Sequence, residues 1–186
     1  AGEKGKARDV LAAVRALHAV ERDRRPATAA EQAALANFPG FGPVALSLFA
    51  DPVTGRYKDA GWQTLGDELK SLLTPDEYAS AKRTTFTAFY TSPTVIAAIH
   101  AAVRRLGVPA DARVLEPGCG TGNFLAAAPP GMRFTAVELD SVSGRIARAR
   151  QPAHDVRVED FRDTKLPAGL DAVVGNVPFA DVRNEY

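Results

Sequence analysis

The sequence is poor in the residues that build covalent or metal-linked scaffolds. It contains one cysteine, three histidines, one methionine and one tryptophan among 186 residues. A single cysteine, Cys119, excludes an internal disulfide and a cysteine-built zinc site, and no metal-ligand motif is present. Because disulfides belong to oxidising compartments, this composition leads us to expect a cytoplasmic protein.

Long apolar runs and an excess of one charge are also missing. No stretch approaches the roughly 20 apolar residues that span a bilayer, so we expect neither a membrane segment nor a signal peptide. The 23 basic and 22 acidic side chains leave a net charge of +1, which alone does not indicate a nucleic-acid partner. Apolar residues make up 46% of the chain, a fraction typical of globular domains.

Residues 1–90 have the apolar spacing of helices. Thr28 with Glu31, and Thr74 with Glu77, match the capping box that begins a helix. We therefore expect a helical N-terminal region, residues 1–90, that packs on a sheet as a supporting layer. The alternative is a DNA-facing arm that uses a cluster of three arginines. These are Arg22, Arg24 and Arg25.

From residue 91 onward, short apolar strands alternate with amphipathic helices. The strands are expected at 113–115, 134–137, 156–158 and 172–174. This alternation indicates a parallel, doubly wound α/β sheet that binds ligands at the carboxyl ends of its strands. Residues 91–186 are therefore expected to form the ligand-binding core, with polar segments gathered on one rim.

A glycine-rich loop, residues 116–122, follows the first expected strand. Gly118, Gly120 and Gly122 permit a sharp turn and a close approach of the backbone to a ligand. The spacing Gly-x-Gly-x-Gly differs from the Gly-x-Gly-x-x-Gly that seats a dinucleotide pyrophosphate. Glu116, at the strand end, suits a zwitterionic amino acid because its carboxylate can face an ammonium group.

Two more acidic residues follow the next strands. Glu138 ends the second strand, where it can accept hydrogen bonds from both hydroxyls of a ribose. Asp160 ends the third, where it can accept from an adenine amino group with Phe161 against the ring; the alternative for Asp160 is a capping or turn residue. The loop and these acids predict a site for S-adenosylmethionine (SAM), and the alternative for the loop is a plain strand-to-helix turn.

The fourth strand leads into Asn176-Val177-Pro178-Phe179. An exocyclic amine is a poor nucleophile because its lone pair is delocalised into the ring. The Asn176 oxygen and a carbonyl beside Pro178 can accept hydrogen bonds from that amine and stabilise the charge that grows during alkylation. Phe179 can stack on a base turned out of its helix. We predict that Asn176, Pro178 and Phe179 are catalytic; the alternative is a loop with a turn-forming Asn and a core Phe.

These motifs resemble class I SAM-dependent amino-methyltransferases, especially DNA adenine-N6 methyltransferases with the motif (Asp/Asn)-Pro-Pro-(Tyr/Phe). Thr91 lies in a segment that resembles the one covering the methionine end of SAM. The resemblance implies a Rossmann-like class I methyltransferase sheet and methyl transfer to the N6 amine of adenine in double-stranded DNA, with base flipping. Val177 departs from the family by replacing the first Pro of the usual pair.

A wider pattern is similar to the methylase region of large phage- and plasmid-type methylase–helicase proteins, some of which serve in defence or anti-restriction. It includes Pro26, Thr28 and Glu31 and a Gly-Phe-Gly turn. The family sheet has seven strands, whereas about four are expected here, so we expect an incomplete core, truncated after the fourth strand. A fragment, a partly ordered portion or half of a split enzyme would each fit, with a helicase domain or partner subunit supplying the missing strands and target recognition.

Three functions remain open from the sequence. The leading one is methyl transfer from SAM to adenine N6 in DNA. A second keeps the reaction and changes the acceptor to a protein glutamine or an RNA guanine. A third is a non-catalytic DNA-binding scaffold, against which the intact set Glu116, Glu138, Asp160 and Asn176 argues.

Overall fold

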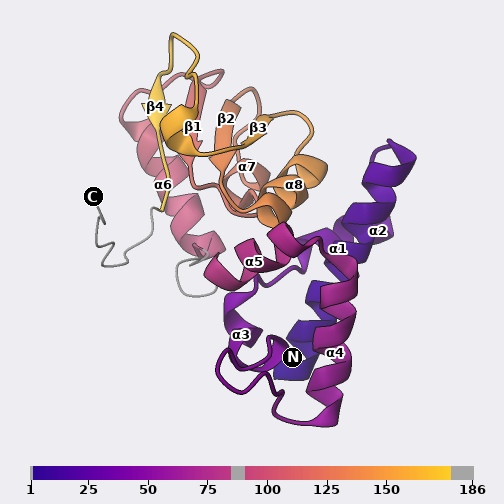
Figure 1. Cartoon of the computed structure of the whole chain (residues 1–186). Coiled ribbons are helices and arrows are strands. Elements are labelled where there is room, and N and C mark those ends of the chain that lie inside the picture. The colour runs from indigo at the N-terminus through magenta and orange to yellow at the C-terminus, as the bar shows by residue number, and fades with distance from the viewer. Residues whose placement is uncertain (1, 85–90, 177–186) are drawn as a thin grey trace.

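The computed structural model describes residues 2–84 and 91–176, and the first of these ranges is helical, as predicted. None of the helices in the two described ranges is long and apolar enough to span a bilayer. In chain order the elements of the first range are α1 (Glu3–Asp23), α2 (Ala29–Ala36), the 3-10 helix η1 (Gly42–Val44), α3 (Ala45–Leu48), α4 (Ala60–Leu72) and α5 (Pro75–Thr84). In Figure 1 the helices α3 and α4 of this range lie in the lower half of the view, and α2 rises at the right.

Local capping explains where these helices begin. At α2 the Glu31 N–H donates to Thr28 Oγ1 over 3.3 Å, and the Thr28 N–H donates to Glu31 Oε2 over 2.8 Å. Thr74 and Glu77 make the same reciprocal pair at the start of α5, at 3.2 and 2.8 Å. Both predicted capping boxes are confirmed. Each satisfies two backbone N–H groups that would otherwise have no partner within the helix.

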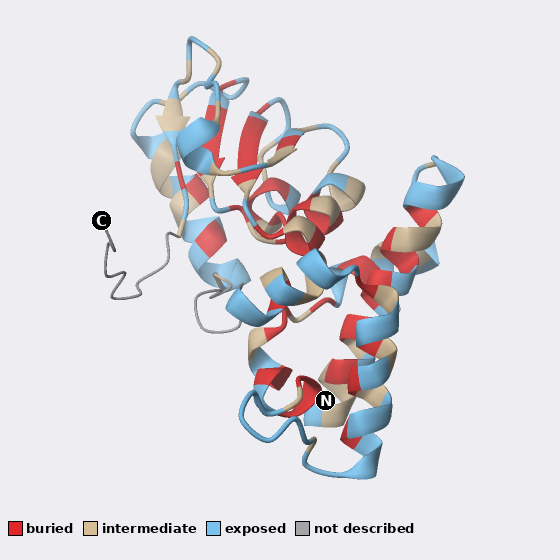
Figure 2. Cartoon of the chain, viewed as in Figure 1, coloured by how far each residue is buried: buried red, intermediate tan, exposed pale blue. Residues whose placement is uncertain are grey.

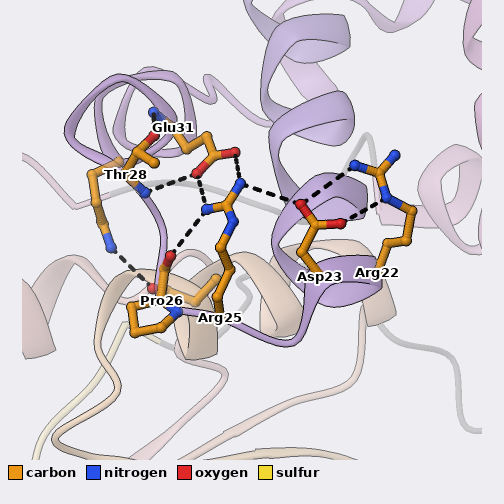
Figure 3. A network of polar contacts seen from close by, with 8 residues as sticks. Arg22, Asp23, Arg25, Pro26, Thr28 and Glu31 are labelled. Atoms are coloured by element: carbon orange, nitrogen blue, oxygen red, sulfur yellow. Dashed lines mark hydrogen bonds and ion pairs between the residues drawn. The ribbon is translucent and has the colours of Figure 1, made fainter.

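The arginine cluster proposed as a DNA-facing arm is partly neutralised by neighbouring acids (Figure 3). Arg25 forms a two-pronged ion pair with Glu31, at 2.7 and 2.8 Å, and also contacts Asp23. Arg22 donates to Asp23 over 2.8 Å. Two of the three arginines therefore serve the α1–α2 corner, which favours the supporting layer over the arm.

The second described range forms the predicted α/β unit. All four strands are parallel, in the order β3-β2-β1-β4, which is the strand order that opens a Rossmann sheet. The predicted fold class is therefore confirmed. Its elements are α6 (Pro93–Arg105), β1 (Arg113–Pro117), α7 (Asn123–Ala126), β2 (Arg133–Glu138), α8 (Ser141–Arg150), β3 (Asp155–Val158), the 3-10 helix η2 (Phe161–Asp163) and β4 (Ala172–Val173).

One face of the sheet carries the helices of this range. Phe134 and Glu138 point to the same face because side chains alternate along a strand. His100 of α6 packs edge-on against Phe134, and a Cβ placed on Gly144 of α8 would lie 3.1 Å from Glu138 Cβ. The α7 residue Phe124 joins the same buried cluster.

The β3–β4 connection crosses the opposite face. Arg157 and Arg113 both point there, and they donate to the carbonyls of Lys165 and Ala168 in this connection, each at 2.7 Å. The connection contains η2 and no α-helix, so the doubly wound expectation is met on one face only. Because the connections change face between β1 and β4, this pair marks the switch point where open α/β sheets bind ligands.

The helical region packs on α8 and not directly on the sheet, which corrects the expected position of the supporting layer. Val142 and Ile146 of α8 belong to the buried cluster of the helical region, while Ala147 belongs to the cluster around the sheet. Figure 2 shows buried residues concentrated in both parts and along α8 between them. The proposed domain boundary at residue 90 adjoins residues 85–90, which lie outside the described ranges, and stays a prediction.

Candidate cofactor and catalytic site

The segments that follow the four strands lie along one edge of the sheet, the rim. The strand order places them as Asn176 after β4, Glu116 at the end of β1, Glu138 at the end of β2 and Asp160 after β3. Adjacent strands lie about 4.8 Å apart, so the row spans roughly 14 Å. This geometry suits an elongated ligand laid across the strand ends.

The glycine loop folds back over β2. Gly118, Gly120 and Gly122 have φ values of 69, 54 and 77°, a left-handed conformation that glycine adopts without strain. A Cβ on Gly118 would meet no atom within 4 Å, whereas a Cβ on Gly122 would lie 3.2 Å from Ala147 Cβ. Gly122 therefore lets α8 pack closely, and Gly118 leaves backbone open to a ligand.

Glu116 is the most deeply buried acid of the row, with 3% of its surface exposed. Its Oε2 atom has no hydrogen-bond partner in the described part of the chain. Burial raises the pKa of this carboxyl well above its ordinary value, and the nearby charge of Glu138 raises it further. A buried carboxylate without a donor is unfavourable, so this group fits a ligand that brings a cation.

Glu138 is held by two backbone donors. Gly120 N–H donates to its Oε2 over 2.7 Å, and Asp140 N–H donates to its Oε1 over 2.8 Å. Burial raises the pKa of Glu138, although these two hydrogen bonds oppose the shift. Each carboxylate oxygen retains a second lone pair, so a fixed Glu138 can still accept hydrogen bonds from two ribose hydroxyls.

Asp160 makes the capping contacts that were the alternative for it. Its Oδ1 accepts the Arg162 N–H over 2.9 Å at the start of η2, and its Oδ2 pairs with the Arg162 guanidinium at 2.7 Å. The hydrogen bond from Arg162 lowers the pKa of Asp160 to about 2. An adenine contact stays a prediction. Phe161 is 43% exposed beside it, so its ring is accessible to a planar ligand.

The end of β4 lies directly beside the glycine loop. Val174 N–H donates to the Leu115 carbonyl over 2.9 Å, and a Cβ on Gly175 would lie 3.3 Å from the Pro117 carbonyl oxygen. Asn176, which is half-buried, therefore follows at the mouth of this loop. The other predicted catalytic residues, Pro178 and Phe179, lie outside the described residues.

Thr91 lies immediately before α6 and is half-buried. The C-terminal end of α6 leads to the start of β1, so the first turn of α6 lies toward the rim. The Val95 N–H donates to Ser92 Oγ over 3.4 Å and caps this turn. The position fits the predicted contact with the methionine end of a cofactor, which stays a prediction.

Asp140 is a site residue that the sequence motifs did not single out. It is 2% exposed, caps α8 by accepting the Ser143 N–H over 2.9 Å, and donates its own N–H to Glu138. The sequence signal that could have identified it is an acidic residue immediately before a helical segment. Among residues 2–84 and 91–176, no group of three or more His, Cys, Asp or Glu side chains is placed to hold a metal ion.

The chain is similar to a methyltransferase and to a protein named for defence against restriction. It is 34% identical over 103 residues to Type II methyltransferase M.XamI of Xanthomonas campestris pv. amaranthicola, covering 50% of this chain and 19% of that protein. It is 41% identical over 73 residues to Defense against restriction protein B of Escherichia phage P1, covering 38% of this chain and 3% of that protein. The resemblance drawn from the motifs is confirmed: this chain carries a methyltransferase-like region.

The remaining comparisons add little. No protein-family model matches the chain. The methyltransferase subunit of a type I restriction-modification system from Streptococcus thermophilus is 18% identical, with a TM-score of 0.42 over 63% of this chain and 32% of that one. This likeness is too weak to carry an argument. The chain thus spans about a fifth, or less, of the curated relatives it matches, at 19% and 3% of their lengths.

Proposed function

We propose that this chain binds SAM along the rim and transfers its methyl group to the N6 amine of adenine in DNA. The observation that carries the proposal is the buried Glu116 carboxylate, whose Oε2 has no hydrogen-bond partner among the described residues. It lies between Glu138 on one neighbouring strand and Asn176 beyond the other. The similarity to a Type II methyltransferase supports methyl transfer as the reaction class.

The residues of the rim suit the successive parts of the cofactor. Glu116 would hold the methionine ammonium, which would bring a cation to its buried carboxylate. Glu138 would accept from the ribose hydroxyls, and Gly118 would let the backbone approach the ligand. SAM, when bound, supplies an electrophilic methyl group on a sulfonium. Thr91, Gly120, Gly122, Asp160 and Phe161 complete the proposed cofactor site.

The acceptor amine would lie at the mouth of the glycine loop, beside Asn176. The Asn176 side-chain oxygen would accept a hydrogen bond from the amine, favour a tetrahedral nitrogen and stabilise the positive charge that develops on it. Pro178 would place a backbone carbonyl for the second hydrogen, and Phe179 would stack on the flipped base. Holding amine and methyl group in line supplies much of the remaining rate enhancement.

DNA is the proposed acceptor because one relative is a Type II methyltransferase and another is named for defence against restriction. We further propose a cytoplasmic role in defence or anti-restriction, with a helicase domain or partner subunit contributing to target recognition. A protein glutamine, an RNA guanine, or a scaffold role without catalysis are the competing assignments, and direct assays separate them.

Calorimetry with SAM tests the cofactor site, using two glycine variants as a matched pair. Gly118 and Gly107 both have a positive φ and open space in front of the missing Cβ, but Gly107 ends α6 far from the rim. Both substitutions to Ala introduce a similar backbone strain of about 1 kcal/mol. We expect Gly118→Ala to abolish SAM binding and Gly107→Ala to retain it. Equal binding by both variants would remove Gly118 from the site.

Transfer of a tritiated methyl group tests the reaction. We expect label in unmethylated DNA and none in RNA or protein. Asn176→Ala should lower the rate at least 100-fold, roughly the loss of one preorganised polar contact in a transition state, while SAM affinity changes less than about threefold. SAM binding without transfer to any acceptor would contradict catalysis by this chain and favour the scaffold.

A further inference from the structure

We propose that the N-terminal helical region positions the ribose-binding carboxylate of Glu138 through a hydrogen-bonded relay that begins at Ser80. The inference rests on the proposed function for the role of Glu138 and on the structure for the relay itself. It assigns Ser80, a residue of α5 that touches no ligand, as a positioning residue for the nucleoside end of the cofactor. Nothing in the sequence motifs connects α5 with the rim.

The relay is continuous from α5 to the glycine loop. Ser80 Oγ donates to Asp140 Oδ1 over 3.0 Å, across 60 positions of sequence. Asp140 N–H then donates to Glu138 Oε1 over 2.8 Å, and Glu138 Oε2 accepts the Gly120 N–H over 2.7 Å. Four residues on three separate segments are thereby linked end to end.

The relay depends on the hydrogen bonds that the Asp140 carboxylate accepts. Asp140 is 2% exposed, so it depends on protein donors. Its Oδ2 accepts the Ser143 N–H, and among the described residues Ser80 is the donor to Oδ1. Removing the Ser80 hydroxyl leaves a buried carboxylate oxygen without that donor. A shift of the Asp140 backbone that brings this oxygen toward water would also carry the Asp140 N–H away from Glu138.

Other contacts dock the helical region, so loss of Ser80 should not release it. Arg145 of α8 pairs with both Glu21 of α1 and Glu77 of α5. Ile146, which is fully buried, packs into the cluster of the helical region from the same face of α8. The Ser80 contact is therefore separable: it acts on the β2–α8 corner and leaves the interface in place.

Calorimetry with S-adenosylhomocysteine and its 2′,3′-dideoxyribose analogue tests the proposal on wild-type protein and Ser80→Ala. If Glu138 is mispositioned in Ser80→Ala, the affinity for S-adenosylhomocysteine should fall roughly five- to tenfold, the effect of about one hydrogen bond. The dideoxy analogue has no hydroxyl for Glu138 to hold, so its affinity should stay within about twofold. Ser80→Thr keeps a hydroxyl and should restore affinity. Ser71→Ala removes the α4 hydroxyl that donates to the Glu68 carbonyl and should change nothing.

Amide hydrogen exchange in the free protein gives a second readout that needs no ligand. In Ser80→Ala the Asp140 and Gly120 amides should lose protection, while amides in the middle of α1 keep theirs. Three results for Ser80→Ala would overturn the relay. They are an unchanged affinity for both ligands, an equal loss of affinity for both, and unchanged hydrogen exchange at the Asp140 and Gly120 amides. If the wild-type protein binds neither ligand, the proposed function fails, and the exchange experiment alone then decides whether Ser80 holds this corner.

Discussion

Replacing Glu116 with glutamine should stabilise the ligand-free protein and lower its affinity for SAM. The carboxylate is 3% exposed and its Oε2 has no partner in the described part of the chain. Glutamine keeps the size and shape of the side chain and removes its charge. An unsatisfied buried polar group costs about 1–3 kcal/mol, and a charged one costs more. We therefore expect the variant to gain at least about 1 kcal/mol in free energy of unfolding at neutral pH.

The pH dependence of this gain follows from the raised pKa of Glu116. Burial makes the folded chain hold this proton more tightly than the unfolded chain, whose carboxyl has the ordinary pKa of 4.5. Wild-type stability should therefore fall as pH rises from 4.5 toward the raised folded-state pKa, whereas the glutamine variant has no such loss. The two proteins should differ least below pH 4.5 and most above the folded-state pKa.

The effect on ligands separates the ammonium contact from the rest of the site. A hydrogen bond to a charged group contributes about 1.5–3 kcal/mol, so loss of the carboxylate should weaken SAM roughly 10- to 100-fold. S-adenosylhomocysteine retains the ammonium, so its affinity should fall by the same factor. Methylthioadenosine lacks the amino-acid part and should bind both proteins alike.

Urea unfolding from pH 4 to 9, with calorimetry at neutral pH, measures both effects. Glu159→Gln is the matched control, because Glu159 follows β3 and is exposed. It should change neither stability nor binding. Unchanged SAM affinity in Glu116→Gln would refute the ammonium contact, and a variant less stable than wild type above neutral pH would refute the reasoning from burial.

Three further predictions concern the helical region and its contact with α8. Arg145→Met should lower the free energy of unfolding by about 2 kcal/mol, a value between those for exposed and buried ion pairs. If urea unfolding shows no decrease in that free energy, the ion pairs of Arg145 do not stabilise the contact between α8 and the helical region. Ile146→Ala should lower the free energy of unfolding by about 3 kcal/mol in the same assay, since the side chain is fully buried; a loss below about 1 kcal/mol would contradict its core position. The hydrogen bond from Arg25 lowers the pKa of Glu31 to about 2. The stabilisation by the ionised Glu31 should therefore be complete above pH 4.5 and be lost as pH falls through 2. If acid unfolding of Glu31→Gln matches that of the wild type, Glu31 makes no such contribution.

Much of the fold could be predicted because its signals are local. The capping boxes at Thr28 and Thr74 involve residues three positions apart, and their geometry is as expected. The strands lie where apolar runs predicted them, within two residues at each end. Helix α4 has an equally local start, with Asp59 accepting the Trp62 N–H over 2.9 Å, although no motif drew attention to it.

By itself, the sequence determined the identity and chain order of the rim residues, because each follows a strand and parallel strands share one carboxyl edge. Tertiary structure decided what each side chain contacts. Glu116 Oε2 has no partner within residues 2–84 and 91–176, Asp160 is paired with Arg162, and Ser80 reaches Asp140 across 60 positions of sequence. It also placed the helical region on α8 and not on the sheet. Spacing within a segment sets direction and periodicity, but burial and long-range hydrogen bonds depend on which segments pack together, and no local pattern encodes that choice.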